Sequence, residues 1–248
     1  MIITGKSSDG PMIDLLYLTH NRRKFTEASL RQLILSTNWS LVSRFMIYDD
    51  HSTDGTYEHL QHASQAHRDW GVTPAMPAPE LCSGEYGGPV AVMNDYLSER
   101  DPQKPQLFAK IDSDTMVPPG WLDACVDVMR RHRELGLLGI EAFCVVNAAK
   151  QVRSYRSTPY IGGIGLMRAE AFVTLPRPNG RFGFTAWQEN APKVHKGWID
   201  PALPVFLLDR LPLEPWRSLS KEYIAKGWQR QWQPYTDDQR ELWSWWCD

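Results

Sequence analysis

The stretch LFAKIDSD, residues 107–114, has the pattern of a buried strand followed directly by two aspartates around one serine. The apolar run over 107–111 predicts a buried strand, and Asp112, Ser113 and Asp114 follow it at once. Two carboxylates that flank one small residue can face the same cation, and Mg²⁺ and Mn²⁺ prefer oxygen ligands. Such a pair alone is a weak signal, because aspartate also favours ordinary turns. Its place after a strand favours a metal site, since open α/β sheets bind ligands at the carboxyl ends of their strands.

Strands and helices alternate around this stretch. Buried apolar runs that predict strands are followed by segments whose apolar residues recur at helical spacing. This alternation predicts an α/β fold with a mainly parallel central sheet flanked by helices. We expect strands at 13–18, 45–48, 107–111, 137–146, 160–167 and 205–208, and helices at 25–37, from 56, at 89–100, from 121 and at 185–195.

The composition indicates one globular domain without a strong bulk charge. The 248 residues are 42% hydrophobic, which is enough for one core and a small appendage. A net charge of -2 gives no general reason to bind nucleic acid or an anionic membrane. No apolar run approaches the roughly 20 residues of a spanning helix, and no signal peptide is visible. The scattered cysteines predict reduced thiols and a cytoplasmic protein; they are Cys82, Cys125, Cys144 and Cys247.

Polar side chains gather directly after three of the predicted strands. Residues 19–22 read Thr-His-Asn-Arg, residues 49–50 are both aspartate, and residues 112–114 form the acidic pair. The carboxyl ends of neighbouring parallel strands meet at one edge of a sheet. We therefore expect these segments to surround one cleft.

Four segments, 19–22, 48–56, 87–94 and 112–114, occur in the order found in the family 2 glycosyltransferases of the GT-A fold, which the first half of the chain resembles. The resemblance implies a nucleoside diphosphate sugar donor, with a UDP-sugar favoured, and Mn²⁺ or Mg²⁺ as cofactor. It implies that Asp50 contacts the base. The donor-binding residues implied in this way are Thr19, Asn21, Arg22, Asp50, Asp54, Gly88, Asn94, Asp112 and Ser113.

The resemblance implies two further groups in the second half. The family has an acidic pair that supplies the catalytic base, and here Glu189 is the one acidic residue at that place; the alternative is a solvated helix residue. An inverting transfer needs such a carboxylate to take the acceptor's proton. Relatives often add a late metal ligand, for which Asp209 is the candidate and His195 the alternative. The expected metal ligands are Asp112, Asp114 and Asp209.

The leading hypothesis is a metal-dependent, inverting glycosyltransferase that passes a sugar to an acceptor hydroxyl. A saccharide is the favoured acceptor, and a modified DNA base is a less favoured one, suggested by the basic residues within 150–156 and the aromatic tail. Two other classes stay open: a nucleotidyltransferase that forms a sugar nucleotide, and a non-catalytic sugar-nucleotide-binding protein. We expect the transferase domain at 1–215 and a Trp-rich tail at 216–248 that packs on the core or covers the acceptor side.

Overall fold

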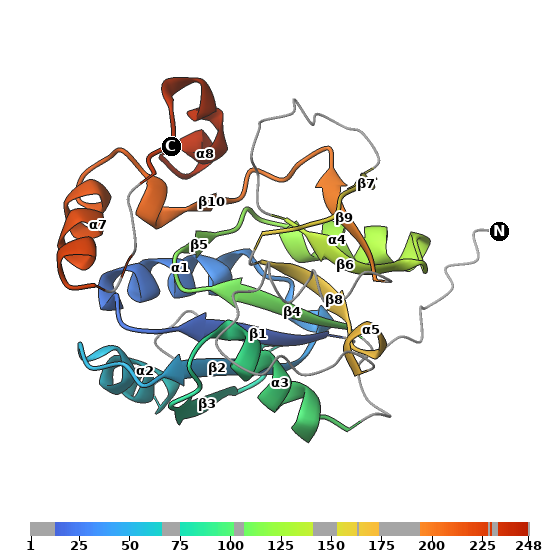
Figure 1. Ribbon diagram of the computed structural model, residues 1–248, viewed down its shortest axis with the longest axis horizontal. Coiled ribbons are helices and arrows are strands. Elements are labelled where there is room, and N and C mark those ends of the chain that lie inside the picture. Colours follow the sequence, from blue (N-terminus) through green and yellow to red (C-terminus); the bar gives the residue numbers. More distant parts are fainter. Residues whose placement is uncertain are drawn as a thin grey trace.

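A mixed β-sheet with helices on both faces forms the centre of the protein (Figure 1). The computed structural model describes residues 13–65, 75–101, 107–140, 153–162, 164–173, 194–227, 229 and 233–247. Within these ranges the main sheet has eight strands in the order β3-β2-β1-β4-β8-β6-β9-β7. The predicted α/β class, with a large central sheet flanked by helices, is confirmed.

The strands of the main sheet are β1 (Ile13–Thr19), β2 (Val42–Asp50), β3 (Pro79–Gly84), β4 (Leu107–Asp112), β6 (Leu135–Gly139), β7 (Ser154–Ser157), β8 (Gly165–Arg168) and β9 (His195–Asp200). A second, two-stranded sheet pairs β5 (Thr115–Met116) with β10 (Phe206–Leu207). The helices are α1 (Arg23–Ser36), α2 (Thr56–Gln65), α3 (Pro89–Glu99), α4 (Trp121–Arg131), α5 (Glu170–Val173), α7 (Trp216–Ala225) and α8 (Glu241–Cys247). Short 3-10 turns are η1 (Trp39–Leu41), η3 (Leu208–Arg210) and η4 (Asp237–Gln239).

The N-terminal half of the sheet is parallel and brings three strand ends together. β3, β2, β1 and β4 all run in the same direction, whereas β8 is antiparallel to β4 and β6. In register, Thr19 lies opposite Asp49, and Leu18 lies opposite Asp112. The predicted gathering of these strand ends at one edge is therefore observed.

Side chains of β1 alternate between two hydrophobic layers, as a strand buried on both faces requires. Leu15 and Tyr17 face a cluster that α1 and α4 complete, and Leu16 and Leu18 face a cluster that α3 completes. All seven residues of β1 are buried, including its polar members. The strand that ends at the cleft is thus held rigidly from both sides.

The second half of the chain departs from the expected elements in three places. The strand expected at 160–167 begins at Gly165, and β7 lies in the basic stretch, where no strand was predicted. His195, expected at the end of a helix, begins β9, so that prediction is wrong. β9 pairs with β6 and β7, and these partners are distant in sequence. Sheet pairing of this kind overrides a local helical pattern.

The C-terminal helices pack onto the start of α1 and the two-stranded sheet (Figure 1). Phe25, Phe206, Tyr223 and Trp243 belong to one buried cluster there. Trp228 and Trp232 lie outside the described residues. Of the helices that the structure describes, none has the length and hydropathy needed to cross a membrane. The described cysteines, Cys82, Cys125 and Cys247, are unpaired.

Candidate functional site

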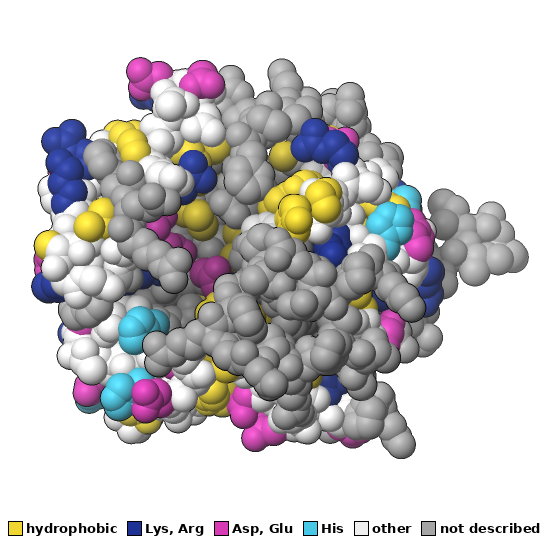
Figure 2. Space-filling model, viewed as in Figure 1, with side chains coloured by type: hydrophobic (Ala, Val, Ile, Leu, Met, Phe, Trp, Pro, Cys, Tyr) yellow, Lys and Arg dark blue, Asp and Glu magenta, His cyan; other side chains and the backbone are white. Residues whose placement is uncertain are grey.

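A cavity of about 530 Å³ opens at the carboxyl ends of β1, β2 and β4. This volume lies in the range typical of small-molecule sites. In the space-filling view, acidic side chains lie inset near the middle of one face, next to hydrophobic ones (Figure 2). Six of the residues predicted to bind the donor line the cavity: Thr19, Arg22, Asp50, Gly88, Asp112 and Ser113.

Asp50 stands between the end of β2 and the loop before α3. Its Oδ1 accepts backbone N–H bonds from Tyr86 at 2.7 Å and Gly87 at 3.0 Å. Among the described residues, none donates a hydrogen bond to the other carboxylate oxygen, so Asp50 can offer that oxygen to a ligand in the cavity. The Asp50 carbonyl lies 2.5 Å from His20 Nδ1, which joins the β1 and β2 loops.

Gly88 provides the turn into α3. Its φ of +123° lies in a region that residues with a Cβ rarely adopt, and a Cβ there would meet no atom within 4 Å. The glycine is therefore required by the backbone conformation and not by crowding. Gly87, Gly88 and Pro89 all line the cavity, so the α3 N-terminus borders it. A helix N-terminus favours anions because its first N–H groups lack intrahelical partners.

Three predicted donor residues do not line this cavity. Asn21 Oδ1 accepts the Thr53 N–H at 2.8 Å, and Asp54 accepts the N–H groups of Arg23 at 2.9 Å and Thr56 at 3.1 Å. These bonds fasten the β1 loop to the β2 loop and cap the two helices that follow. Asn94 lies half-buried on α3. A direct role of these three residues in donor binding stays a prediction.

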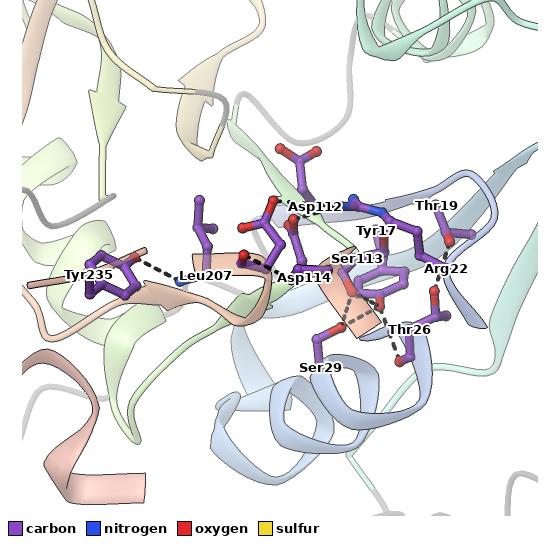
Figure 3. Close-up of polar contacts among 12 residues, drawn as sticks. Tyr17, Thr19, Arg22, Thr26, Ser29, Asp112, Ser113, Asp114, Leu207 and Tyr235 are labelled. Carbon is purple, nitrogen blue, oxygen red and sulfur yellow. Dashed lines mark hydrogen bonds and ion pairs between the residues drawn. The ribbon is translucent and has the colours of Figure 1, made fainter. Parts of the chain in front are cut away.

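Each aspartate of the acidic pair lies beside a cationic side chain. Figure 3 shows Arg22 beside Asp114. Lys110 Nζ lies 2.6 Å from Asp112 Oδ1, and Arg22 Nη1 lies 3.0 Å from Asp114 Oδ2. Asp112 keeps 34% of its side chain exposed toward the cavity, whereas Asp114 keeps 9%. Desolvation raises the pKa of Asp112, and the Lys110 charge opposes the rise.

A buried polar network holds the loop between these aspartates. The Ser29 hydroxyl donates to the Ser113 carbonyl at 2.7 Å and lies 2.6 Å from the Tyr17 hydroxyl (Figure 3). Burial raises the pKa of Tyr17, which keeps its hydroxyl protonated and able to donate. Thr26 and Ser29 are polar residues on the buried face of α1, and this pattern is the sequence signal for the network. The sequence analysis did not predict the network.

Asp209 lies beside Asp114, as the hypothesis of a late metal ligand requires. β10 pairs with β5, and the Leu208 N–H donates to the Asp114 carbonyl at 2.7 Å, which brings η3 to the acidic loop. Asp209 Oδ2 lies 3.7 Å from Arg22 Nη1, and its Oδ1 is buried without a hydrogen-bond partner in the described structure. Burial and the Asp114 charge raise the pKa of Asp209 to about 8. His195 instead contacts Tyr155 and Ser157 on β7.

The donor set suits a hard divalent cation in its chemistry. Asp112, Asp114 and Asp209 offer only carboxylate oxygens, which Mg²⁺ and Mn²⁺ prefer. The unpaired oxygen and raised pKa of Asp209 indicate that Arg22 does not fully balance the two carboxylates around it. Among the described residues, no group of three or more His, Cys, Asp or Glu side chains is arranged to hold a metal ion. Metal binding by these three aspartates therefore stays a prediction.

We expect Asp209→Asn to change how stability depends on pH. Folding raises the pKa of Asp209, so above its unfolded value, about 3.9, the folded state binds more protons than the unfolded state. Stability should therefore fall as pH rises toward about 8, by at most about 1.4 kcal/mol per pH unit. Urea unfolding in EDTA should show this fall in the wild type and a shallower slope in Asp209→Asn. Asp127→Asn, which changes an exposed carboxyl, should keep the wild-type slope; equal slopes in all three proteins would contradict the assignment.

Glu189, the predicted catalytic base, lies outside the described residues. So do Lys150 and most of the predicted helix at 185–195. Arg156 lies on the edge strand β7, and Arg153 is the residue before that strand. The described residues therefore include the predicted donor-binding residues and metal ligands but not the predicted catalytic base.

Solved structures share this fold. No protein-family model matches the chain, and no curated protein matches it in sequence. TarS of S. aureus, segment 1–349 in complex with UDP-GlcNAc, aligns with a TM-score of 0.55 and 15% identity over 77% of this chain and 57% of that one. The same segment in complex with UDP aligns with a TM-score of 0.56 and 14% identity, over 86% and 70%. The chain thus covers little more than half of the TarS segment in the first alignment.

Proposed function

We propose that the protein transfers a sugar from a nucleoside diphosphate sugar, with a UDP-sugar favoured, to an acceptor hydroxyl. One observation carries the proposal: a single cavity is lined by Asp50, by the N-terminus of α3 and by Asp112 and Ser113 of the acidic loop. These provide, in order, an acceptor for a base N–H, a site for phosphate and a carboxylate that can bind a divalent cation. The UDP and UDP-GlcNAc complexes of TarS, which has the same fold, support a nucleotide-sugar donor.

Asp112, Asp114 and Asp209 would hold Mn²⁺ or Mg²⁺ together with the diphosphate. When bound, the cation supplies charge neutralisation for the leaving diphosphate. Lys110 pairs with Asp112 Oδ1 and so orients that carboxylate, and Ser29 fixes the loop through the Ser113 carbonyl. Arg22 lines the cavity and can add a bidentate contact to phosphate.

The proposed transfer inverts the configuration at the anomeric carbon of the sugar. The acceptor hydroxyl would attack from the face opposite the diphosphate while Glu189 takes its proton. Glu189 is proposed from the family resemblance alone. A saccharide is the favoured acceptor, and a hydroxylated DNA base is the alternative.

A panel of donors tests the proposal. The protein is incubated with nucleoside diphosphate sugars, with and without Mn²⁺ and candidate acceptors, and the released nucleotide is identified. We expect metal-dependent release of nucleoside diphosphate that an acceptor saccharide accelerates. Release of pyrophosphate from a nucleoside triphosphate and a sugar phosphate would instead identify a nucleotidyltransferase. Tight donor binding without any turnover would identify a binding protein.

A further inference from the structure

The two aspartates of the acidic pair have counter-ions that differ in freedom. Lys110 extends from β4, its side chain is 1% exposed, and its Nζ lies 2.6 Å from Asp112 Oδ1. Arg22 follows β1 in a loop, lines the cavity, and places Nη1 3.0 Å from Asp114 Oδ2 and 3.7 Å from Asp209 Oδ2. Asp112 thus has a fixed cation from the core, whereas Asp114 has one that belongs to the cavity wall.

Hydrogen bonds fix the backbone around Arg22, whereas its long side chain can rotate. Asn21 bonds to Thr53, and the Arg23 N–H donates to Asp54, so both neighbours of Arg22 are fastened to the β2 loop. Arg22 itself has a left-handed φ of 61°. The guanidinium at the end of the side chain can change partners by rotation about side-chain bonds, without a shift of the loop.

We propose that Arg22 is an exchangeable counter-ion that couples the binding of the divalent cation to that of the nucleotide. In the free protein its guanidinium lies between the carboxylates of Asp114 and Asp209. When a divalent cation binds those carboxylates, Arg22 turns into the cavity and contacts the diphosphate. The identity of that anion rests on the proposed function, whereas the competition between Arg22 and the cation does not.

The physical basis is the repulsion between two positive groups that share the same carboxylates. Without nucleotide, Arg22 opposes metal binding because displacing it breaks a charge-assisted hydrogen bond. A diphosphate gives the displaced guanidinium a new bidentate partner, so this cost disappears. Metal and nucleotide therefore tighten each other's binding by the same factor, as linkage requires.

The test measures Mn²⁺ affinity by electron paramagnetic resonance, with and without UDP, in the wild type and Arg22→Asn. Asparagine removes the charge and is among the residues that tolerate a left-handed φ best. Without UDP, we expect the variant to bind Mn²⁺ about tenfold more tightly than the wild type does. The factor by which UDP tightens Mn²⁺ binding should be about tenfold smaller in the variant. Arg23→Gln, which changes an exposed arginine paired with Glu27, is the matched control and should behave as the wild type.

Unchanged or weaker binding of Mn²⁺ alone to Arg22→Asn would overturn the exchange, and so would a coupling factor equal to that of the wild type. Circular dichroism of each variant establishes that it is folded, and Arg22→Lys, which keeps the charge, should retain most of the competition. Donor turnover by the wild type is measured separately. Turnover with unchanged Mn²⁺ affinity in Arg22→Asn refutes the exchange alone, and tighter Mn²⁺ binding without any donor turnover refutes the transferase alone.

Discussion

Asp114→Ala is expected to lower donor-dependent release of nucleoside diphosphate by about 10³-fold or more. Asp114 is the closest partner of Arg22 and stands next to Asp209, so its removal leaves the proposed cation with too few carboxylate ligands. We expect the fold to survive. Burial raises the pKa of Asp209 and the Asp114 charge adds to the rise, so the substitution removes a repulsion between two carboxylates. The Asp114 carbonyl, which accepts the Leu208 N–H, is unchanged by the substitution.

The measurement is the rate of diphosphate release at saturating donor and Mn²⁺, with circular dichroism to establish folding. Asp127→Ala is the matched control, because this aspartate lies on α4, is 59% exposed and pairs with Arg131. It should keep the wild-type rate. A folded Asp114→Ala protein with normal turnover would contradict the assignment of the site.

Glu189→Gln should stop sugar transfer while it spares donor binding. A glutamine cannot accept the acceptor's proton, and loss of a general base typically costs about 10²–10⁴-fold in rate. Donor affinity should stay at the wild-type value, since the proposed donor contacts come from the cavity at β1, β2 and β4.

Calorimetry with UDP-sugar and the transfer rate to a saccharide acceptor give the two quantities. Glu170→Gln, a change at an exposed glutamate at the start of α5, should leave both unchanged. If Glu189→Gln transferred sugar at the wild-type rate, another residue would have to be the base.

The N-terminal half could be predicted because its signals are local. An apolar run followed by polar residues identifies β1, β2 and β4 and places their ends at one edge, where the cavity lies. Asp209 lies in η3, the turn that follows β10, and its role as a metal ligand stays a prediction. At the ends of β1, β2 and β4 the polar side chains adjoin the strand that carries them.

Other parts of the site depend on contacts that a sequence does not display. Asn21 and Asp54 have the residue types of ligand contacts, yet their side chains bond to backbone groups of neighbouring loops. Ser29 supports the acidic loop although it lies 84 positions before Ser113 in the sequence. The sequence did not predict strand β7, and it predicted a helix where His195 begins β9. Both errors arise because β9 and its partners pair across long sequence separations.

The most direct test is a crystal structure of the protein with Mn²⁺ and UDP, in which anomalous scattering locates the cation. We predict one manganese peak bonded to carboxylate oxygens of the 112–114 loop and to the diphosphate, with the uracil beside Asp50. A structure in which UDP binds elsewhere, or in which Asp112 and Asp114 both point away from the manganese, would contradict the account.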